Sequence, residues 1–329
     1  MSLYISKENI PAFVKSLSET FDIFFTNDEL AYQTYSYGKS RKVNLDLIRP
    51  VTPLKSFFFV NYEKLQQKDR KKPRIILGVK SCDLKALQVL DRMFMEGVVT
   101  DPFYEQNRKD TIIVTSDCPE PGKSCFCTLV GSKPYCEEGF DVNLAPVNGG
   151  YIADVGSENG EEIINRNRAL FGNLSEKVYA LRDKQRQESI RKLKEINKEF
   201  SGLEGLDYQK TVREKYSFSD KWQEESKSCV QCLGCNNICP SCFCFMISEE
   251  DKDKTRYRYW DACHSTSYAR VAGGMNARPK LYERFRNRYQ CKFNYRKENF
   301  GVYSCTGCGR CIEVCPGKID IRKVIGKLV

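Results

Sequence analysis

Apolar and polar positions in the first part of the chain alternate between helix-like and strand-like patterns. Residues 8–20 follow a helical pattern, and the apolar run FDIFF at 21–25 directly after them predicts a strand. The aromatic-rich run at 55–61 predicts a further strand, because aromatic and β-branched residues are enriched in strands. These short, mixed segments indicate an α/β arrangement.

The clearest pattern begins at residue 74. The run RIILGV at 74–79 predicts a buried strand, residues 83–94 predict a helix, and DTIIVTSD at 110–117 predicts a second buried strand. The apolar residues of the middle segment recur at helical spacing: Leu84, Leu87, Leu90 and Phe94. Strand, helix and strand of these lengths predict a βαβ unit with parallel strands. A short strand near 149–156 extends the same sheet.

The patterns divide the chain into three parts. We expect an α/β domain at 1–170, a helical linker at 171–228 and a mainly α-helical domain at 229–329. The linker contains a charged, helix-favouring stretch at 174–200 without glycine or proline, as is typical of a solvated helix. A polar segment at 201–228 leads from it to the last domain.

Composition narrows the class of protein. The chain has 329 residues, of which 41% are hydrophobic, so it can build a substantial core. No run approaches the roughly 18–20 apolar residues of a membrane span, and the first residues do not resemble a secretion signal. We therefore expect a cytoplasmic protein with reduced thiols. In that setting its 17 cysteines favour metal binding over a disulfide framework.

Two cysteine runs near the end of the chain repeat the same spacing. The first is Cys-x2-Cys-x2-Cys-x3-Cys-Pro at 229–240, and the second is the same pattern at 305–316. This spacing is typical of ferredoxins with two 4Fe–4S clusters, in which the fourth cysteine of each run binds the other cluster. Structural zinc sites usually combine two short pairs of ligands instead.

Crossed ligation assigns eight cysteines to two clusters. The ligands of cluster one are Cys229, Cys232, Cys235 and Cys315. The ligands of cluster two are Cys305, Cys308, Cys311 and Cys239. Because the two ligand sets interleave, the runs must lie together and form one dicluster ferredoxin-like domain. Paired redox centres of this kind suit electron transfer.

Four further cysteines belong to the α/β part. Cys82 follows the first strand of the βαβ unit, and Cys118 follows the second. Open α/β sheets bind ligands at the carboxyl ends of their strands. Cys125 and Cys127 lie in the next loop, DCPEPGKSCFC, which can fold over the same edge. A third cluster held by these four thiols is the favoured interpretation. The alternative is that they are small buried side chains, as free cysteines often are.

Several segments together carry a family resemblance. GVKSCDLKALQVLDRMF, DPFYEQNRKDTIIVTSDC, SCFCTLVG, CPSCFC and CTGCGRCIEVCP resemble the iron–sulfur subunit of soluble sulfhydrogenases and the A subunit of anaerobic sulfite reductases. The resemblance covers residues 70–320. It implies an electron-transfer subunit that works beside a flavin- and NAD(P)H-binding subunit and a terminal hydrogenase or reductase, the latter including heterodisulfide-reductase-like proteins. The twelve cysteines above match cysteines of the family. Cys291 departs from the family pattern, in which histidine is common, and is interpreted as packing.

The remaining candidates have weaker patterns. Cys242 and Cys244 repeat the SCFC sequence of 124–127 and are interpreted as packing, although one of them could instead join the third site. Cys263 precedes the single histidine, His264, but neighbours in sequence rarely face each other, so a Cys–His nucleophile is disfavoured. Cys136 is interpreted as incidental.

Net charge admits two explanations. The formal charge of +10 could attract nucleic acid or could offset anionic clusters. Seven arginines between the two cysteine runs are interleaved with aromatic residues: Arg256, Arg258, Arg270, Arg278, Arg284, Arg286 and Arg288. Their position between the runs favours a role around the clusters, with no nucleic acid.

We therefore expect an iron–sulfur electron-transfer subunit of a cytoplasmic oxidoreductase complex. The sequence contains neither a dinucleotide-binding G-x-G-x-x-G after a strand nor a phosphate-binding loop, so electrons must come from other proteins or from diffusing carriers. Two rival functions stay open. One is a self-contained reductase of a sulfur compound, and the other is a nucleic-acid-binding protein with structural clusters.

Overall fold

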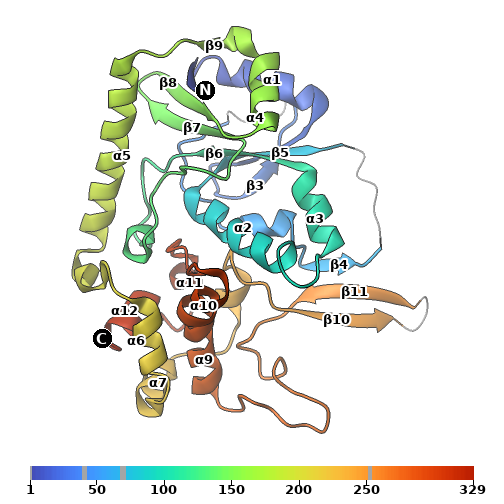
Figure 1. Ribbon diagram of the computed structural model, residues 1–329, viewed down its shortest axis with the longest axis vertical. Helices are drawn as coiled ribbons and strands as arrows, with labels where there is room; N and C mark the ends of the chain where they lie inside the picture. The colour runs from blue at the N-terminus through green and yellow to red at the C-terminus, as the bar shows by residue number, and fades with distance from the viewer. Residues whose placement is uncertain (1, 39–42, 67–71, 251–253) are drawn as a thin grey trace.

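The computed structural model describes residues 2–38, 43–66, 72–250 and 254–329 (Figure 1). In these residues, eight strands form one mixed sheet with the spatial order β3–β2–β5–β6–β7–β8–β1–β9. The strands are β1 (Ser2–Ser6), β2 (Asp22–Thr26), β3 (Tyr32–Thr34), β5 (Arg74–Val79), β6 (Thr111–Ser116), β7 (Val142–Val147), β8 (Gly150–Val155) and β9 (Phe171–Gly172). The centre of the sheet, β2–β5–β6–β7, is parallel, and the remaining pairs are antiparallel.

The predicted βαβ unit is present. Strands β5 and β6 are parallel neighbours with Ile75 paired to Ile112, and α2 (Ser81–Phe94) crosses between them. Because successive side chains of a strand point to opposite faces, Ile75 joins one core and Ile76 the other. Helices α1 (Ile10–Thr20) and α4 (Glu158–Arg166) supply the first core, whereas α2 and α3 (Pro102–Lys109) supply the second.

The predicted strand at 55–61 is wrong. Residues Leu54–Phe57 form the 3₁₀ helix η1, and strand β4 begins only at Tyr62 and ends at Lys64. Pro53 precedes the helix, where the fixed φ of proline is compatible with a helix start. The aromatic residues of this run are buried by packing, with Phe59 stacked against Trp260 and 5.2 Å from the Phe94 ring centroid. Their burial against other rings explains why an apolar run here does not form a strand.

The predicted charged helix is α5 (Glu176–Ile196), which runs along one side of the molecule (Figure 1). The polar segment after it also contains helices. These are η4 (Lys198–Leu203), α6 (Tyr208–Glu214) and α7 (Ser219–Ser226). Trp222 of α7 is fully buried against Phe285 and Tyr289 of α9 (Leu281–Tyr289), so this segment is part of the C-terminal core. The proposed domain boundaries stay a prediction.

The C-terminal part combines short helices with a β hairpin. Helix α8 (Gly234–Asn237) precedes α9. The elements that follow α9 are the π-helix η5 (Gln290–Tyr295), α10 (Arg296–Phe300), α11 (Arg310–Glu313) and α12 (Ile321–Gly326). Strands β10 (Phe245–Glu250) and β11 (Thr255–Trp260) form the hairpin, and β11 pairs with β4. The hairpin thereby joins the cysteine-rich part to the α/β part, which the expectation of a mainly helical domain did not include.

Candidate iron–sulfur sites

The two cysteine runs have the same local structure. In the first run, Leu233 adopts a left-handed conformation and the four-residue helix α8 follows it. In the second run, Gly309 does the same and α11 follows. The two helices contact each other, so the repeat in sequence becomes a pair of loops side by side. This is the arrangement that crossed ligation requires.

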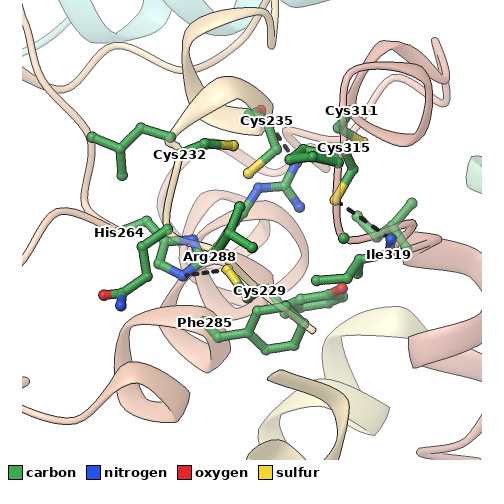
Figure 2. A pocket seen from close by; sticks show the side chains of 16 residues that line it. Cys229, Cys232, Cys235, His264, Phe285, Arg288, Cys311, Cys315 and Ile319 are labelled. Carbon is green, nitrogen blue, oxygen red and sulfur yellow. Dashed lines mark hydrogen bonds between the residues drawn. The ribbon is translucent and has the colours of Figure 1, made fainter. Parts of the chain in front are cut away.

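One pocket gathers the four cysteines assigned to cluster one. Its lining includes Cys229, Cys232, Cys235 and Cys315, together with Cys311. Figure 2 shows the sulfur atoms of the first four pointing toward the space between the two runs. Cys315 belongs to the second run, so the structure brings together thiols from both runs as the crossed assignment expects.

The surroundings of this pocket are apolar with a few directed polar groups. The backbone N–H of Ile319 donates to Cys315 Sγ at 3.4 Å, and Arg288 donates to the carbonyl of Cys235 at 3.4 Å. His264 Nε2 lies 3.8 Å from Cys229 Sγ (Figure 2). Burial, with the nearby Arg288, lowers the pKa of His264 to about 4, so its ring is neutral at pH 7. The His264 ring therefore faces Cys229 of the first cysteine run.

The cysteines assigned to cluster two lie beside this pocket. Burial raises the pKa of Cys305 to about 12 and that of Cys311 to about 11. Cys239 is buried as well, and the ammonium group of Lys292 donates to its sulfur at 3.0 Å. Buried thiols of high pKa ionise when a metal coordinates them. The donor set and its burial therefore fit iron–sulfur ligation at both predicted sites.

The N-terminal cysteines lie at the carboxyl edge of the sheet, as predicted. Cys82 is in the first turn of α2 after β5, and Cys118 follows β6. Burial raises the pKa of Cys127, and the adjacent Cys118 and Cys125 raise it further, so these three thiols are close neighbours. Cys82 lies near Cys308 of the second run. The structure thus brings three of the four together, with Cys82 on the side of the second run.

Arg49 connects the two groups of cysteines. Its side chain is buried. Burial raises the pKa of Cys82, Cys118 and Cys125, and the positive charge of Arg49 offsets part of this rise. Its Nε donates to the carbonyl of Cys308 at 2.6 Å, and its other end pairs with Glu313 at 2.8 Å. A positive charge held between these thiols suits a region that carries anionic groups.

The loop at 124–127 packs directly on the second run. Phe126 N–H donates to the carbonyl of Gly307 at 2.8 Å. A Cβ atom on Gly307 would lie 2.5 Å from the backbone of Cys127, and one on Gly309 would lie 2.4 Å from the carbonyl of Ser124. Both glycines have positive φ. Glycine at these positions therefore allows both the loop conformation and the close approach.

The corresponding positions of the first run carry Gln231 and Leu233, which also have positive φ. Non-glycine residues adopt this conformation uncommonly. The two runs thus share a backbone conformation, whereas only the second combines it with close packing against the α/β part. The sequence repeat predicts the conformation but not this difference.

Four cysteines outside the twelve assigned ones also lie together. Cys242, Cys244, Cys263 and Cys291 line one pocket beside the two runs. Sequence reasoning missed this group because its members come from three separate segments. The available signal in the sequence was the number of cysteines, because the 17 in the chain exceed the twelve assigned ones by five. All 17 lie in the described part of the chain and are free thiols.

Comparison with known proteins gives two kinds of match. Residues 228–319 match the model of the 4Fe–4S dicluster domain. Over 344 aligned residues, the chain is 31% identical to "Sulfhydrogenase 2 subunit beta" of Pyrococcus furiosus, which covers 98% of this chain and 97% of the relative. The chain belongs to the sulfhydrogenase beta-subunit family. The predicted resemblance is thereby confirmed, and the dicluster domain supports the presence of 4Fe–4S clusters.

The chain also resembles part of a formate dehydrogenase beta subunit. It is 25% identical over 154 residues to "F420-dependent formate dehydrogenase subunit beta" of Methanocaldococcus jannaschii. That match covers 47% of this chain and 31% of the relative, so it extends to a part of each only. Within the described residues, no helix has the length and apolar character needed to cross a membrane.

Proposed function

We propose that this chain is the electron-transfer subunit of an oxidoreductase complex. The observation that carries the proposal is the crossed arrangement of the two cysteine runs. Cys315 of the second run lies in the same pocket as Cys229, Cys232 and Cys235 of the first. Two clusters that share ligand segments lie close together, which favours transfer of single electrons between them.

The proposed ligands follow the two sets given above. Cys229, Cys232, Cys235 and Cys315 hold cluster one; the other set holds cluster two, with Cys239 as the member from the first run. The clusters supply reversible one-electron redox chemistry when bound. The chain's own groups fix the ligands and compensate their charge. Lys292 donates to Cys239, and Arg288 is buried beside Cys235.

The proposed electron path uses partners on both sides. A flavin- and NAD(P)H-binding subunit exchanges electrons with this chain, and a terminal catalytic subunit completes the path. The support is the relationship to a sulfhydrogenase beta subunit over nearly the whole chain, together with a partial match to a formate dehydrogenase beta subunit. Hydrogenase, sulfite reductase and heterodisulfide-reductase-like proteins are the candidate terminal enzymes.

The proposed ligands of a third cluster are Cys118, Cys125, Cys127 and Cys82. The first three lie near one another, and Cys82 lies on the side of the second run. The support for this cluster is their placement at the carboxyl edge of parallel strands and against the loop of cluster two. A cluster there would extend the pair into the α/β part of the chain.

Reconstitution separates the relay from a self-contained reductase. The anaerobically purified chain is mixed with an NAD(P)H-reduced flavoprotein, and cluster reduction is followed by EPR spectroscopy. We expect the reduced signals to include those of the two interacting ferredoxin-type clusters, and no consumption of sulfite or polysulfide by the chain alone with reduced methyl viologen. Steady turnover of either sulfur compound by the chain alone would contradict the relay and favour a reductase.

A further inference from the structure

A second pocket in the cysteine-rich part is lined by four thiols outside the two runs. Its cysteines are Cys242, Cys244, Cys263 and Cys291. The first two precede β10, the third follows β11, and the last is in η5. The fold therefore brings thiols from three separate segments to one place.

The four thiols are in contact with polar groups and with each other. Asn236 directs its Nδ2 toward Cys263 Sγ at 3.7 Å and Cys242 Sγ at 3.9 Å. Cys244 and Cys263 are close enough to share a hydrogen bond. Cys263 is also buried. Cys242 is also within hydrogen-bonding reach of Cys239, the cluster-two ligand from the first run.

Buried positive charge surrounds the same pocket. Arg288, Lys292 and Arg296 line it, and the ammonium group of Lys55 donates to the carbonyl of Cys242 at 3.0 Å. Among the described residues that line the pocket there is no carboxylate. Cations at buried sites need an anionic partner, because desolvation of an unpaired charge is costly. The available anions at this site are thiolates and whatever they bind.

Two of these guanidinium groups keep an unused donor. Within the described part of the chain, the buried Nε atoms of Arg288 and Arg296 have no hydrogen-bond partner. Buried donors without partners are rare in native structures, and these two are available to an anionic ligand in the pocket. Arg288 is itself only 5% exposed, so solvent does not readily satisfy it.

The backbone at the site is unusual. Cys291 and Lys292 lie in the π-helix η5, at Gln290–Tyr295. π-Helical turns are rare and occur frequently at functional sites. Here the π-helix places Cys291 in the four-thiol pocket and directs Lys292 toward Cys239 and Ser241, to which its Nζ donates at 3.0 and 2.8 Å.

We propose that Cys242, Cys244, Cys263 and Cys291 hold an additional 4Fe–4S cluster. Four thiols, buried cations without carboxylates and unused buried donors together match an anionic cluster with four thiolate ligands. Four cysteines can also hold structural zinc, and the iron and zinc content of the protein separates the two. A redox disulfide would use two of the thiols and leave the other two without a role.

The position of the site connects it to both predicted clusters. Arg288 lines this pocket and the pocket of cluster one, whereas Lys292 spans the distance between this pocket and Cys239 of cluster two. The inference rests on the proposed electron-transfer function, which it extends with a further one-electron site. The site lies at the base of the β10–β11 hairpin, since Cys244 directly precedes β10.

The test compares cysteine variants of the full chain, produced and reconstituted anaerobically. Cys263→Ala and Cys291→Ala remove proposed ligands. Cys136→Ala is the matched control, because Cys136 is as buried as Cys263 but lies outside all four groups. Iron, zinc and acid-labile sulfide per chain are measured, together with the number of spins in the reduced EPR spectrum.

We expect each ligand variant to lose about four irons and one cluster signal, with the control unchanged. The two ferredoxin-type signals should remain in every variant. Unchanged iron, or loss of about one zinc ion instead of iron, would overturn the proposal.

Wild-type crystals provide a measurement that does not depend on folding of a variant. Anomalous scattering at the iron edge should show iron between the four sulfur atoms of Cys242, Cys244, Cys263 and Cys291. A pocket without iron in fully reconstituted protein would overturn the proposal. Iron in this pocket without the coupled signals of the two ferredoxin-type clusters would instead refute the proposed relay, so the two failures are distinguishable.

Discussion

Asp83 and Arg310 form a buried ion pair between the α/β part and the second cysteine run. Asp83 is in the first turn of α2, and Arg310 directly precedes Cys311. Their side chains are 1% and 0% exposed, and the guanidinium group reaches the carboxylate at 2.7 and 2.9 Å. Arg310 also donates to the carbonyl of Pro50 at 2.7 Å. The pair therefore joins the strand edge that carries Cys82 to the loop of cluster two.

Replacing Asp83 with alanine leaves the Arg310 charge buried without its counter-ion. Breaking such a pair from one side costs about 3–5 kcal/mol. The backbone carbonyls around Arg310 remain as acceptors, so we expect the lower end, about 3 kcal/mol. With a urea dependence of about 3 kcal/mol per molar for a chain of this size, the unfolding midpoint should fall by roughly 1 M.

Anaerobic urea unfolding of the holoprotein, followed by tryptophan fluorescence, measures this shift. The two tryptophans report from different places, since Trp222 is in the C-terminal core and Trp260 stacks on Phe59 of the α/β part. The matched control is Glu137→Ala, which breaks the exposed 2.7 Å pair with Lys133. Exposed pairs contribute about 0–1 kcal/mol, so the control should hardly move the midpoint.

The double variant Asp83→Leu/Arg310→Met identifies the cause of the loss. Replacing both members of a buried pair by apolar residues is often neutral or stabilising, because no unpaired charge remains. We therefore expect the double variant to recover most of the midpoint. A single variant that behaves like Glu137→Ala, or a double variant no better than the single one, would refute the reasoning.

Three further predictions concern the clusters and their packing. Lys292→Met should lower the reduction potential of cluster two by on the order of 100 mV, because it removes a buried positive charge and a hydrogen bond to Cys239. An EPR-monitored redox titration measures this potential, and an unchanged value would contradict the prediction. Gly309→Ala should destabilise the chain by about 1–3 kcal/mol, because the added methyl group clashes with the 124–127 loop. Gly205→Ala should cost less, since Gly205 has a similar φ but open space around it. Equal losses of stability in urea unfolding would show that only the backbone conformation matters. Cys118→Ser should remove about four irons while both ferredoxin-type signals survive, and an iron count equal to that of wild type would exclude the N-terminal cluster.

Local patterns in the sequence predict the centre of the sheet and the cysteine repeat. The run at 74–79 is a parallel strand because its apolar residues face a core on both sides. The aromatic run around Phe59 is equally apolar, but its rings pack against Trp260 and Phe94, which lie far away in the sequence. Pattern alone does not distinguish burial in a sheet from burial among distant rings.

The four-thiol pocket shows the same limit for a functional site. The ferredoxin runs have regular spacing because one loop supplies three ligands. Cys242, Cys263 and Cys291 come from different elements, so no local spacing connects them. Their signal in the sequence is their number, and only the fold shows that they meet.

The arginines between the runs also acquire their meaning from the fold. Arg258 is buried between Glu63 and Asp101, Arg284 donates to the carbonyl of His264, and Arg288 lies between two thiol pockets. Side chains used in this way contribute to the net charge but cannot contact the phosphates of a nucleic acid. The charges of these three arginines are therefore directed inward, whereas Arg256 and Arg270 are exposed.

The difference between the two cysteine runs indicates where a partner can approach. The second run is covered, because the 124–127 loop lies on Gly307 and Gly309 at a distance that only glycine permits. The first run faces outward: Cys232 is exposed, and Val230 is 64% exposed. Electron transfer between proteins requires the two cofactors to come close together, so an exposed loop favours exchange and a covered one opposes it. We therefore expect cluster one to exchange electrons with one partner, and cluster two to connect cluster one with the thiols around Arg49. A bulky substitution at Val230 should then slow reduction by a flavoprotein without changing the iron content, whereas an unchanged rate would place the contact elsewhere.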